Sequence, residues 1–230
     1  MTSSTSSTSS TSRTSPAART TNMGSAWGIA ITVVIVNSMV QTLLILNDPT
    51  PPLTWWIWPQ ALLSFGAIVA VITLVLMALQ LGSVGECSWS ATLVKARSRF
   101  LPLSAYTAGL AIATVIGFAL WVVPGLIILA ASPYLLIAVA DGRPDPLRNN
   151  VRAIRAGLGR WILLLLVTCL LAGIPWLGSA LAAFFWPGAI GTLLTWVAFG
   201  LAGTALLQLW CRNWRNIMGD ATSPASSIAV

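Results

Sequence analysis

The 230-residue chain has no histidine, a single lysine and only five acidic residues. Without histidine it lacks the commonest general base and the commonest metal ligand. The acidic residues are spread over connecting segments and a tail, so no pair of carboxylates is expected to converge for acid–base catalysis. We therefore predict that the protein is not an enzyme and that it carries no catalytic residue, no cofactor site and no metal site.

Cysteine is also scarce, with Cys87, Cys169 and Cys211 as its three copies. Cys169 falls in the middle of an apolar run, and the other two lie in or beside segments expected at the cytoplasmic side. No C-x-x-C pair is present, and the spacing fits neither a zinc site nor a disulfide framework. No disulfide is predicted.

Charged residues make up 7% of the chain, whereas hydrophobic residues make up 57%. This composition leaves too little polar surface to cover a soluble core. Several uncharged apolar runs exceed the roughly 18 residues that mark a transmembrane helix. The sequence therefore predicts an all-α polytopic integral membrane protein. The net charge of +7 does not indicate nucleic-acid binding, because the basic residues lie in short segments between apolar runs.

Two of the apolar runs are too long for one crossing each. The uncharged segment 100–140 would extend roughly 60 Å as a helix, about twice the hydrocarbon core of a bilayer. A break is expected at 121–125, where Trp-Val-Val-Pro-Gly supplies turn residues, and another at Trp-Pro-Gly 186–188. Six spans in three hairpins are therefore predicted, at about 26–46, 59–81, 101–122, 125–140, 161–183 and 189–211.

The positions of the basic residues predict the orientation of these spans. They form four groups, at 13–19, 95–99, 143–160 and 212–215, and consecutive groups are separated by one hairpin. All four groups then lie on one side of the membrane, and the turns on the opposite side contain no lysine or arginine. The positive-inside rule places the basic side and both termini in the cytoplasm of a protein of the inner (plasma) membrane.

The ends of the chain differ in composition from the six-helix domain expected at 25–215. Residues 1–24 are a Ser/Thr-rich, low-complexity stretch, which is expected to be disordered because it has little apolar area to bury. A polar tail at 216–230 is also expected to be disordered.

The segment from Asp141 to Trp161 is the most charged part of the chain. Asp145 followed by Pro146 predicts a helix start, with the carboxylate accepting from free backbone N–H groups. The predicted apolar stripe is Leu147, Val151, Ile154 and Leu158, flanked by Arg148, Arg152, Arg155 and Arg160. A short amphipathic helix of this kind is expected in the membrane interface with its arginines on anionic headgroups. The alternative is a solvated basic loop that only sets the topology.

A weaker copy of this segment precedes the third span, at 82–100. Ser88 or Ser90 is expected to cap a short interfacial helix there, and its cations, Lys95, Arg97 and Arg99, are further candidates for headgroup contact. Each basic segment precedes a Pro-Gly turn by the same number of residues, which leaves open a parallel internal duplication. The third span itself carries Ala105, Gly109, Ala113 and Gly117 at four-residue spacing, a stripe typical of close helix packing.

The order of turns from Trp121 to Arg160 resembles that of the YciC-like bacterial membrane proteins. An apolar span leads to the turn 123–125, the next span passes through Pro133 and Tyr134, and a helix then follows Asp145. The same order is similar to the membrane domain that precedes some glycerophosphoryl diester phosphodiesterases. The likeness covers roughly 95–185 and implies a six-helix membrane domain without assigned catalysis.

Two functional hypotheses follow. The first is a non-enzymatic structural or accessory protein that interacts with anionic lipids, a membrane complex or a second copy of itself. The alternative is a transporter or channel for a lipid-like or other hydrophobic substrate, since no charged residue lies in the middle of a span. Asn37, Ser38 and Gln41 share one face of the first span. We expect them to form interhelical hydrogen bonds, whereas a transporter would place a water-accessible cavity beside them.

Overall fold

The computed structural model describes residues 18–47, 55, 57–186 and 188–220, which form seven helices and no strand. This confirms the all-α class. The helices are α1 (Ala18–Asn47), α2 (Ile57–Val84), α3 (Trp89–Leu120), α4 (Val122–Ala140), α5 (Pro146–Ala156), α6 (Leu158–Phe185) and α7 (Ala189–Asp220). All except α5 are long and apolar enough to cross a membrane, so six candidate spans are found, as predicted. A helix suits this setting because it satisfies its backbone polar groups internally.

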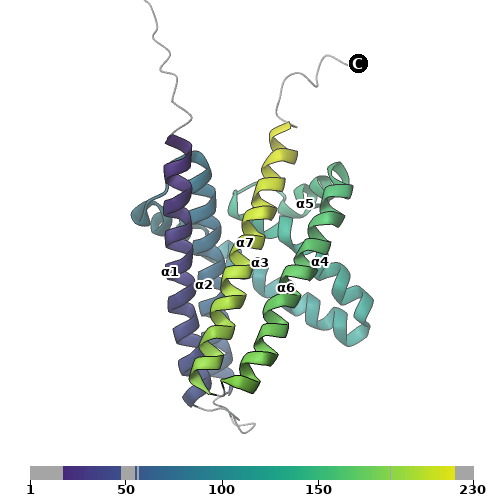
Figure 1. The fold of residues 1–230 in the computed structure, drawn as a ribbon. Coiled ribbons are helices and arrows are strands. Elements are labelled where there is room, and N and C mark those ends of the chain that lie inside the picture. Colours follow the sequence, from purple (N-terminus) through teal and green to yellow (C-terminus); the bar gives the residue numbers. More distant parts are fainter. Residues whose placement is uncertain (1–17, 48–54, 56, 187, 221–230) are drawn as a thin grey trace, which may run out of the picture.

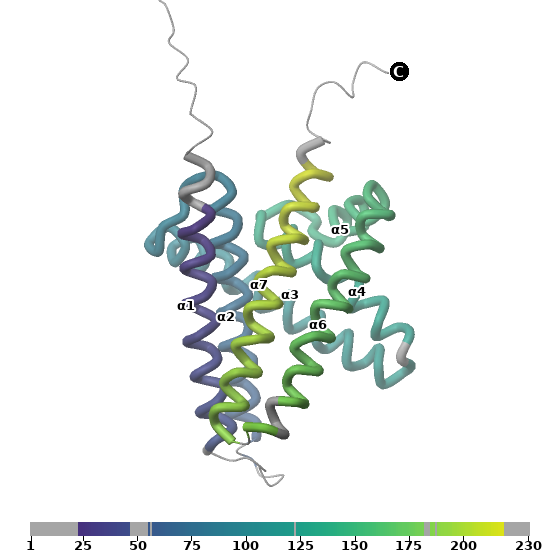
Figure 2. The backbone as a smooth tube through the Cα atoms, in the orientation of Figure 1, coloured from purple at the N-terminus to yellow at the C-terminus, as the bar shows by residue number. Residues whose placement is uncertain are grey.

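Consecutive spans pack as hairpins, α1 with α2, α3 with α4 and α6 with α7. Helix α7 also packs along α1 and lies between α1 and α6 (Figure 1), whereas α2 packs directly against α3. The described ends of the chain, at the start of α1 and the end of α7, lie at the same end of the bundle as α5 (Figure 2). We call this the α5 end of the bundle.

Two glycines allow helices to approach closely. A Cβ atom built on Gly200 of α7 would lie 2.4 Å from a methyl carbon of Val34 on α1, so the two helices meet where a side chain is missing. Gly117 of α3 lies in the same way against the backbone of Gly125 on α4, at 2.9 Å. Both contacts are of the small-residue kind that membrane helices use to pack.

The breaks within the two long apolar runs lie where the sequence predicts them. Trp121 is extended, with φ −171° and ψ 155°, and separates α3 from α4. Gly188 adopts φ +91°, a conformation that glycine tolerates best, and its carbonyl accepts from the Thr192 N–H at 3.2 Å to begin α7. Pro187, the central residue of the second predicted turn, lies outside the described residues.

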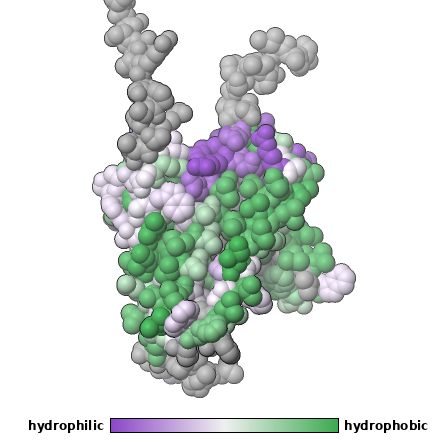
Figure 3. Space-filling view, viewed as in Figure 1, coloured by the Kyte–Doolittle hydropathy of each residue, from purple (hydrophilic) through white to green (hydrophobic). Residues whose placement is uncertain are grey.

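The main core lies toward the α5 end and is built mainly by α2, α4 and α7, with Ala96 and Leu103 of α3 and Ala153 of α5. Its largest fully buried side chains are Leu76 and Met77 of α2, Tyr134 of α4, and Trp210 and Trp214 of α7. The exposed surface of the spans carries many large apolar side chains. The space-filling view shows them as an apolar band, with hydrophilic residues gathered at the α5 end (Figure 3). This distribution fits a bundle surrounded by lipid.

Several predicted boundaries differ from the structure. Helix α1 begins at Ala18, inside the segment 1–24 that was expected to be disordered, and α7 continues to Asp220, beyond the expected domain end at residue 215. Residues 1–17 and 221–230 lie outside the described part. The separate interfacial helix expected in 82–100 is wrong: this segment is continuous with the third span in α3. Pro102 lies inside that helix and does not end it.

Candidate functional site

Helix α5 begins as predicted at Asp145 and Pro146, but the prediction that the Asp145 carboxylate caps the helix is wrong. Asp145 has φ 52° and ψ 63°, a left-handed conformation, and its side chain makes no capping hydrogen bond. The backbone N–H of Asn149 donates to the Asp145 carbonyl at 3.1 Å, and the Asn149 amide donates to the Pro144 carbonyl at 2.6 Å. The asparagine thus stabilises the first turn in place of the aspartate.

The apolar stripe predicted for this segment is mainly exposed, and its last member, Leu158, is the first residue of α6. Leu147, Val151 and Leu158 are 61%, 46% and 52% exposed, and only Ile154 packs partly against the core. The face that packs against the bundle is formed instead by Asn150 and Ala153, which are buried. An outward apolar stripe on a surface helix is typical of a helix that rests in the lipid interface.

Three arginines lie beside this stripe. Arg148, Arg152 and Arg155 are exposed and line a hollow of about 830 Å³ together with Asp145 and Asn149. Among the described residues none of the three guanidinium groups forms an ion pair. We call these three side chains the arginine face. Arg160, at the start of α6, is exposed as well. The arrangement presents unpaired positive charge next to apolar side chains.

A hydrogen-bonded anchor holds the start of this segment to the bundle. The Asp141 carboxylate accepts from the Gln80 amide of α2 and from the Trp214 indole N–H of α7, each at 2.6 Å. Among the described residues this carboxylate forms no ion pair with the neighbouring Arg143 or Arg148. Asp141 therefore joins the α4–α5 turn to two spans that lie far from it in the sequence.

Aromatic side chains continue this connection into the core. The Tyr134 ring packs edge-on against Trp210 with centroids 5.0 Å apart, and it lies 5.7 Å from Trp214. The Asn213 amide donates to the Tyr134 hydroxyl, and the Trp210 indole donates to the Thr168 hydroxyl of α6 at 3.0 Å. The polar tips of Tyr134, Trp210 and Trp214 thus have partners, whereas the buried indole nitrogen of Trp161 has none among the described residues.

The basic segment at the start of α3 contacts the turn between α4 and α5 at Gly142. Ser88 caps α3 as predicted, accepting from the Ala91 N–H at 3.2 Å. Arg97 is exposed, and Lys95 is half-buried. The Arg99 guanidinium lies against Gly142, because a Cβ atom on that glycine would be 2.1 Å from the arginine Nη2. Gly142 also has φ +69°, so both its conformation and its neighbour require the absence of a side chain.

The small-residue stripe of the third span contributes only partly to packing within this chain. Gly117 is buried against α4, and Ala113 is half-buried, whereas Ala105 and Gly109 are exposed. A Cβ atom on Gly109 would meet nothing within 4 Å. The stripe is therefore not one continuous seam between helices of this chain.

The polar face of α1 forms interhelical bonds, as expected. Gln41 is buried, accepts from the Ser64 hydroxyl of α2 at 2.8 Å and donates to the Ser64 carbonyl at 3.3 Å. Ser38 instead bonds to its own helix at Val34. A hollow of about 300 Å³ does reach Asn37, but its other lining residues are almost all apolar.

All three cysteines are free, consistent with the absence of a predicted disulfide. Cys87 lies in the connection between α2 and α3 and donates weakly to the Ala78 carbonyl, with a sulfur–oxygen distance of 3.7 Å. Burial raises the pKa of its thiol above the usual range, and the Thr92 hydroxyl opposes this in part.

Comparison with known protein families, curated proteins and solved structures finds no match for this chain.

Proposed function

We propose that this chain is a non-enzymatic, multi-pass protein of the inner (plasma) membrane that binds anionic lipid headgroups through the arginine face of α5. The observation that carries this proposal is the set of three exposed guanidinium groups, Arg148, Arg152 and Arg155, without a carboxylate partner among the described residues. In this proposal the α5 end is cytoplasmic, because the basic segments gather there and the positive-inside rule applies.

The physical basis is that an apolar surface and a basic surface lie side by side, as the acyl chains and the phosphate of a lipid do. The outward side chains of Leu147, Val151 and Leu158 suit the upper acyl region, and the arginines beside them suit phosphate. A guanidinium donates two parallel N–H bonds to phosphate oxygens, and each basic residue near an anionic surface contributes about 1 kcal/mol. The other basic residues at this end, Lys95, Arg97, Arg99 and Arg160, would add to the same field.

The role that follows is structural or accessory: a membrane domain that gathers anionic lipid beside a partner complex or a second copy of itself. The resemblance to the YciC-like proteins remains a prediction, and the six-helix architecture is compatible with it.

An ion-coupled transporter is less well supported than a lipid-binding protein. Gln41, a buried polar candidate in the first span, is occupied by its hydrogen bonds to Ser64. The hollow beside Asn37 is lined mainly by apolar side chains and is not a polar path. Transport of a hydrophobic substrate remains the alternative.

Native mass spectrometry of the purified protein tests the proposal. The protein is incubated with equal amounts of phosphatidylglycerol and phosphatidylcholine, and the retained lipids are counted. Replacing Arg148, Arg152 and Arg155 with glutamine should lower the retention of phosphatidylglycerol at least roughly ten-fold and leave phosphatidylcholine unchanged. The matched triple Arg→Lys variant keeps the charge and should retain most of the anionic lipid. Equal phosphatidylglycerol retention by the glutamine variant and the unmodified protein would refute the proposal.

A further inference from the structure

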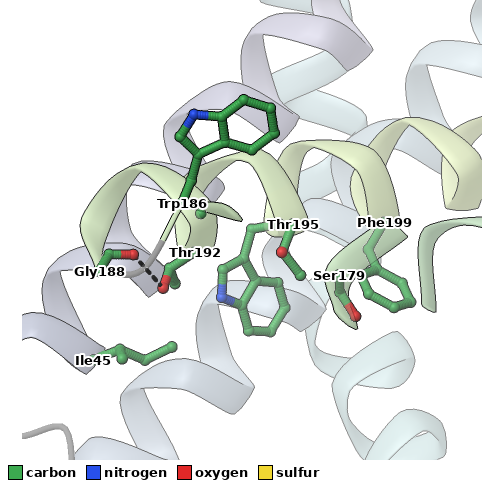
Figure 4. Close-up of a pocket in the computed structure, with 9 residues that line it drawn as sticks. Ile45, Ser179, Trp186, Gly188, Thr192, Thr195 and Phe199 are labelled. Carbon is green, nitrogen blue, oxygen red and sulfur yellow. Dashed lines mark hydrogen bonds between the residues drawn. The ribbon is translucent and has the colours of Figure 1, made fainter. Parts of the chain in front are cut away.

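A third hollow lies at the opposite end of the bundle from α5. It has a volume of about 500 Å³, within the range of small-ligand sites. Side chains from three parts of the chain surround it, including Ile45 of α1, Ser179 of α6 and Thr192 of α7 (Figure 4). Its aromatic lining consists of Trp186, Trp196 and Phe199.

The polar side chains that line this hollow are uncharged. Its lining contains no charged residue. The Thr192 hydroxyl donates to the Gly188 carbonyl at 3.1 Å, and the Ser179 hydroxyl donates to the Trp176 carbonyl at 2.7 Å, so both protons are used locally. The indole N–H of Trp196, in contrast, donates to no described residue, although its side chain is half-buried. An N–H group in an apolar wall favours an occupant that brings a neutral acceptor.

The depth of the hollow indicates what such an occupant would be. The hollow lies where α6 ends and α7 begins, and the exposed indole of Trp186 is of the kind that marks the membrane boundary. The ester carbonyls of lipids lie just below the headgroups, above their apolar chains. We propose that the hollow binds the ester-linked acyl chain of a neutral lipid, with the chain along Phe199 and Ile45 and the carbonyl oxygen accepting from the Trp196 N–H.

This site is separate from the arginine face and selects a different chemistry. The arginine face lies at the α5 end and offers unpaired positive charge, whereas this hollow offers only uncharged donors, among them the Trp196 N–H and the Thr195 hydroxyl, between apolar side chains. An anionic headgroup placed here would have no cation to compensate it. The two sites can therefore be tested independently, and failure of one leaves the other standing.

Photolabelling with a monoacylglycerol tests the proposal. The probe carries a diazirine and an alkyne in its acyl chain, and a matched probe replaces the ester with an ether, which lacks the carbonyl oxygen. With the full-length protein in phosphatidylcholine nanodiscs, the ester probe should label residues 179–199 more than the exposed faces of α3 and of the first half of α6, residues 158–171. Trp196→Phe keeps the ring and removes the N–H, so it should lower labelling by the ester probe about three- to ten-fold. It should leave labelling by the ether probe unchanged.

Trp176→Phe is the control, because Trp176 is exposed on α6 and its side chain does not line the hollow. This variant should label like the unmodified protein with both probes. Labelling spread evenly over all lipid-facing helices would show bulk lipid only and overturn the proposal. An equal loss of both probes in Trp196→Phe would overturn the hydrogen bond to the carbonyl. The wild-type comparison of the two probes provides a result even if the variant unfolds.

Discussion

The two basic segments of this chain precede a span in the same way and yet fold differently. The first, at 89–99, continues into its span without interruption as the start of α3. The second is divided at Gly157, so that α5 is a separate helix from α6. In the first segment Lys95 and Arg99 are half-buried, and Arg99 lies against the α4–α5 turn. In the second, the three arginines of α5 are exposed around one hollow.

The difference shows that the helix break at Gly157, rather than the number of positive charges, decides whether the basic side chains form a separate exposed helix. Proline at 102 does not interrupt α3, but glycine at 157 coincides with the end of α5 and with close contact to α7. A Cβ atom on Gly157 would lie 2.7 Å from the Ile217 side chain. The junction can therefore sit against α7 and leave the arginine face of α5 free. An internal duplication, if present, has diverged at this junction.

The largest expected effect comes from breaking the Asp141 anchor. In Asp141→Asn both bonds lose the charge of the carboxylate: Trp214 donates to the remaining oxygen, and the Gln80 amide has to turn so that its unpartnered Oε1 accepts from the new N–H₂. We expect the free energy of unfolding to fall by about 1–2 kcal/mol, because the Trp214 side chain is buried. Denaturation of the purified protein in mixed detergent, followed by tryptophan fluorescence, measures this change.

Asp145→Asn is the matched control, since the Asp145 side chain makes no capping hydrogen bond and asparagine also tolerates its positive φ. Its stability should stay within about 0.5 kcal/mol of the unmodified protein. A loss at position 145 equal to that at position 141 would show that the anchor is not the source of the effect.

A smaller effect is expected at the junction itself. Gly157→Ala adds a methyl group against the flexible end of Ile217, and we expect a loss of about 1 kcal/mol in the free energy of unfolding. Gly159→Ala, two residues away, meets nothing within 4 Å and lies inside α6, so it should be neutral or stabilising by up to about 1 kcal/mol. The same denaturation measurement compares them, and changes of equal sign and size would contradict the close contact at residue 157.

The smallest expected effect is on the alkylation rate of Cys87, in the connection between α2 and α3. Burial raises the pKa of the Cys87 thiol, so less thiolate is present at a given pH and alkylation is slowed. With Cys169 and Cys211 replaced by serine, iodoacetamide at pH 8 should modify native Cys87 several-fold more slowly than the denatured chain. The rate should continue to rise with pH beyond the range of an ordinary thiol. Equal rates in the native and denatured protein would show that this connection is not packed as described.

Much of the fold could be predicted from the sequence, because it depends on local composition. Six spans, the breaks near Trp121 and Gly188, and the start of α5 after Asp145 all follow from apolar length, turn residues and proline. The cap at Ser88 or Ser90 could be predicted because serine is a favoured first residue of a helix. An interhelical bond of Gln41 could be predicted because a polar side chain inside a span needs a hydrogen-bond partner.

The anchor could not be predicted in this way, because its three members are separated by 61 and 73 positions in the chain. A partial signal was present: Gln80, Asp141 and Trp214 all follow or end apolar runs on the basic side. Along the sequence, the nearest group of opposite charge to Asp141 is Arg143, two residues away. The packing of α2 and α7 around the end of α4 instead brings Gln80 and Trp214 to the Asp141 carboxylate. Such packing cannot be read from the spacing of neighbouring residues.

The central claim is that all basic segments share one face of the membrane, and labelling of single cysteines in intact cells tests it most directly. In a cysteine-free background, Trp121→Cys and Trp186→Cys replace exposed residues at the two predicted outer turns, and Arg152→Cys lies on α5. A membrane-impermeant maleimide should label the first two from outside and Arg152→Cys only after permeabilisation. Labelling of Trp186→Cys and Arg152→Cys from the same side would contradict the six-span arrangement.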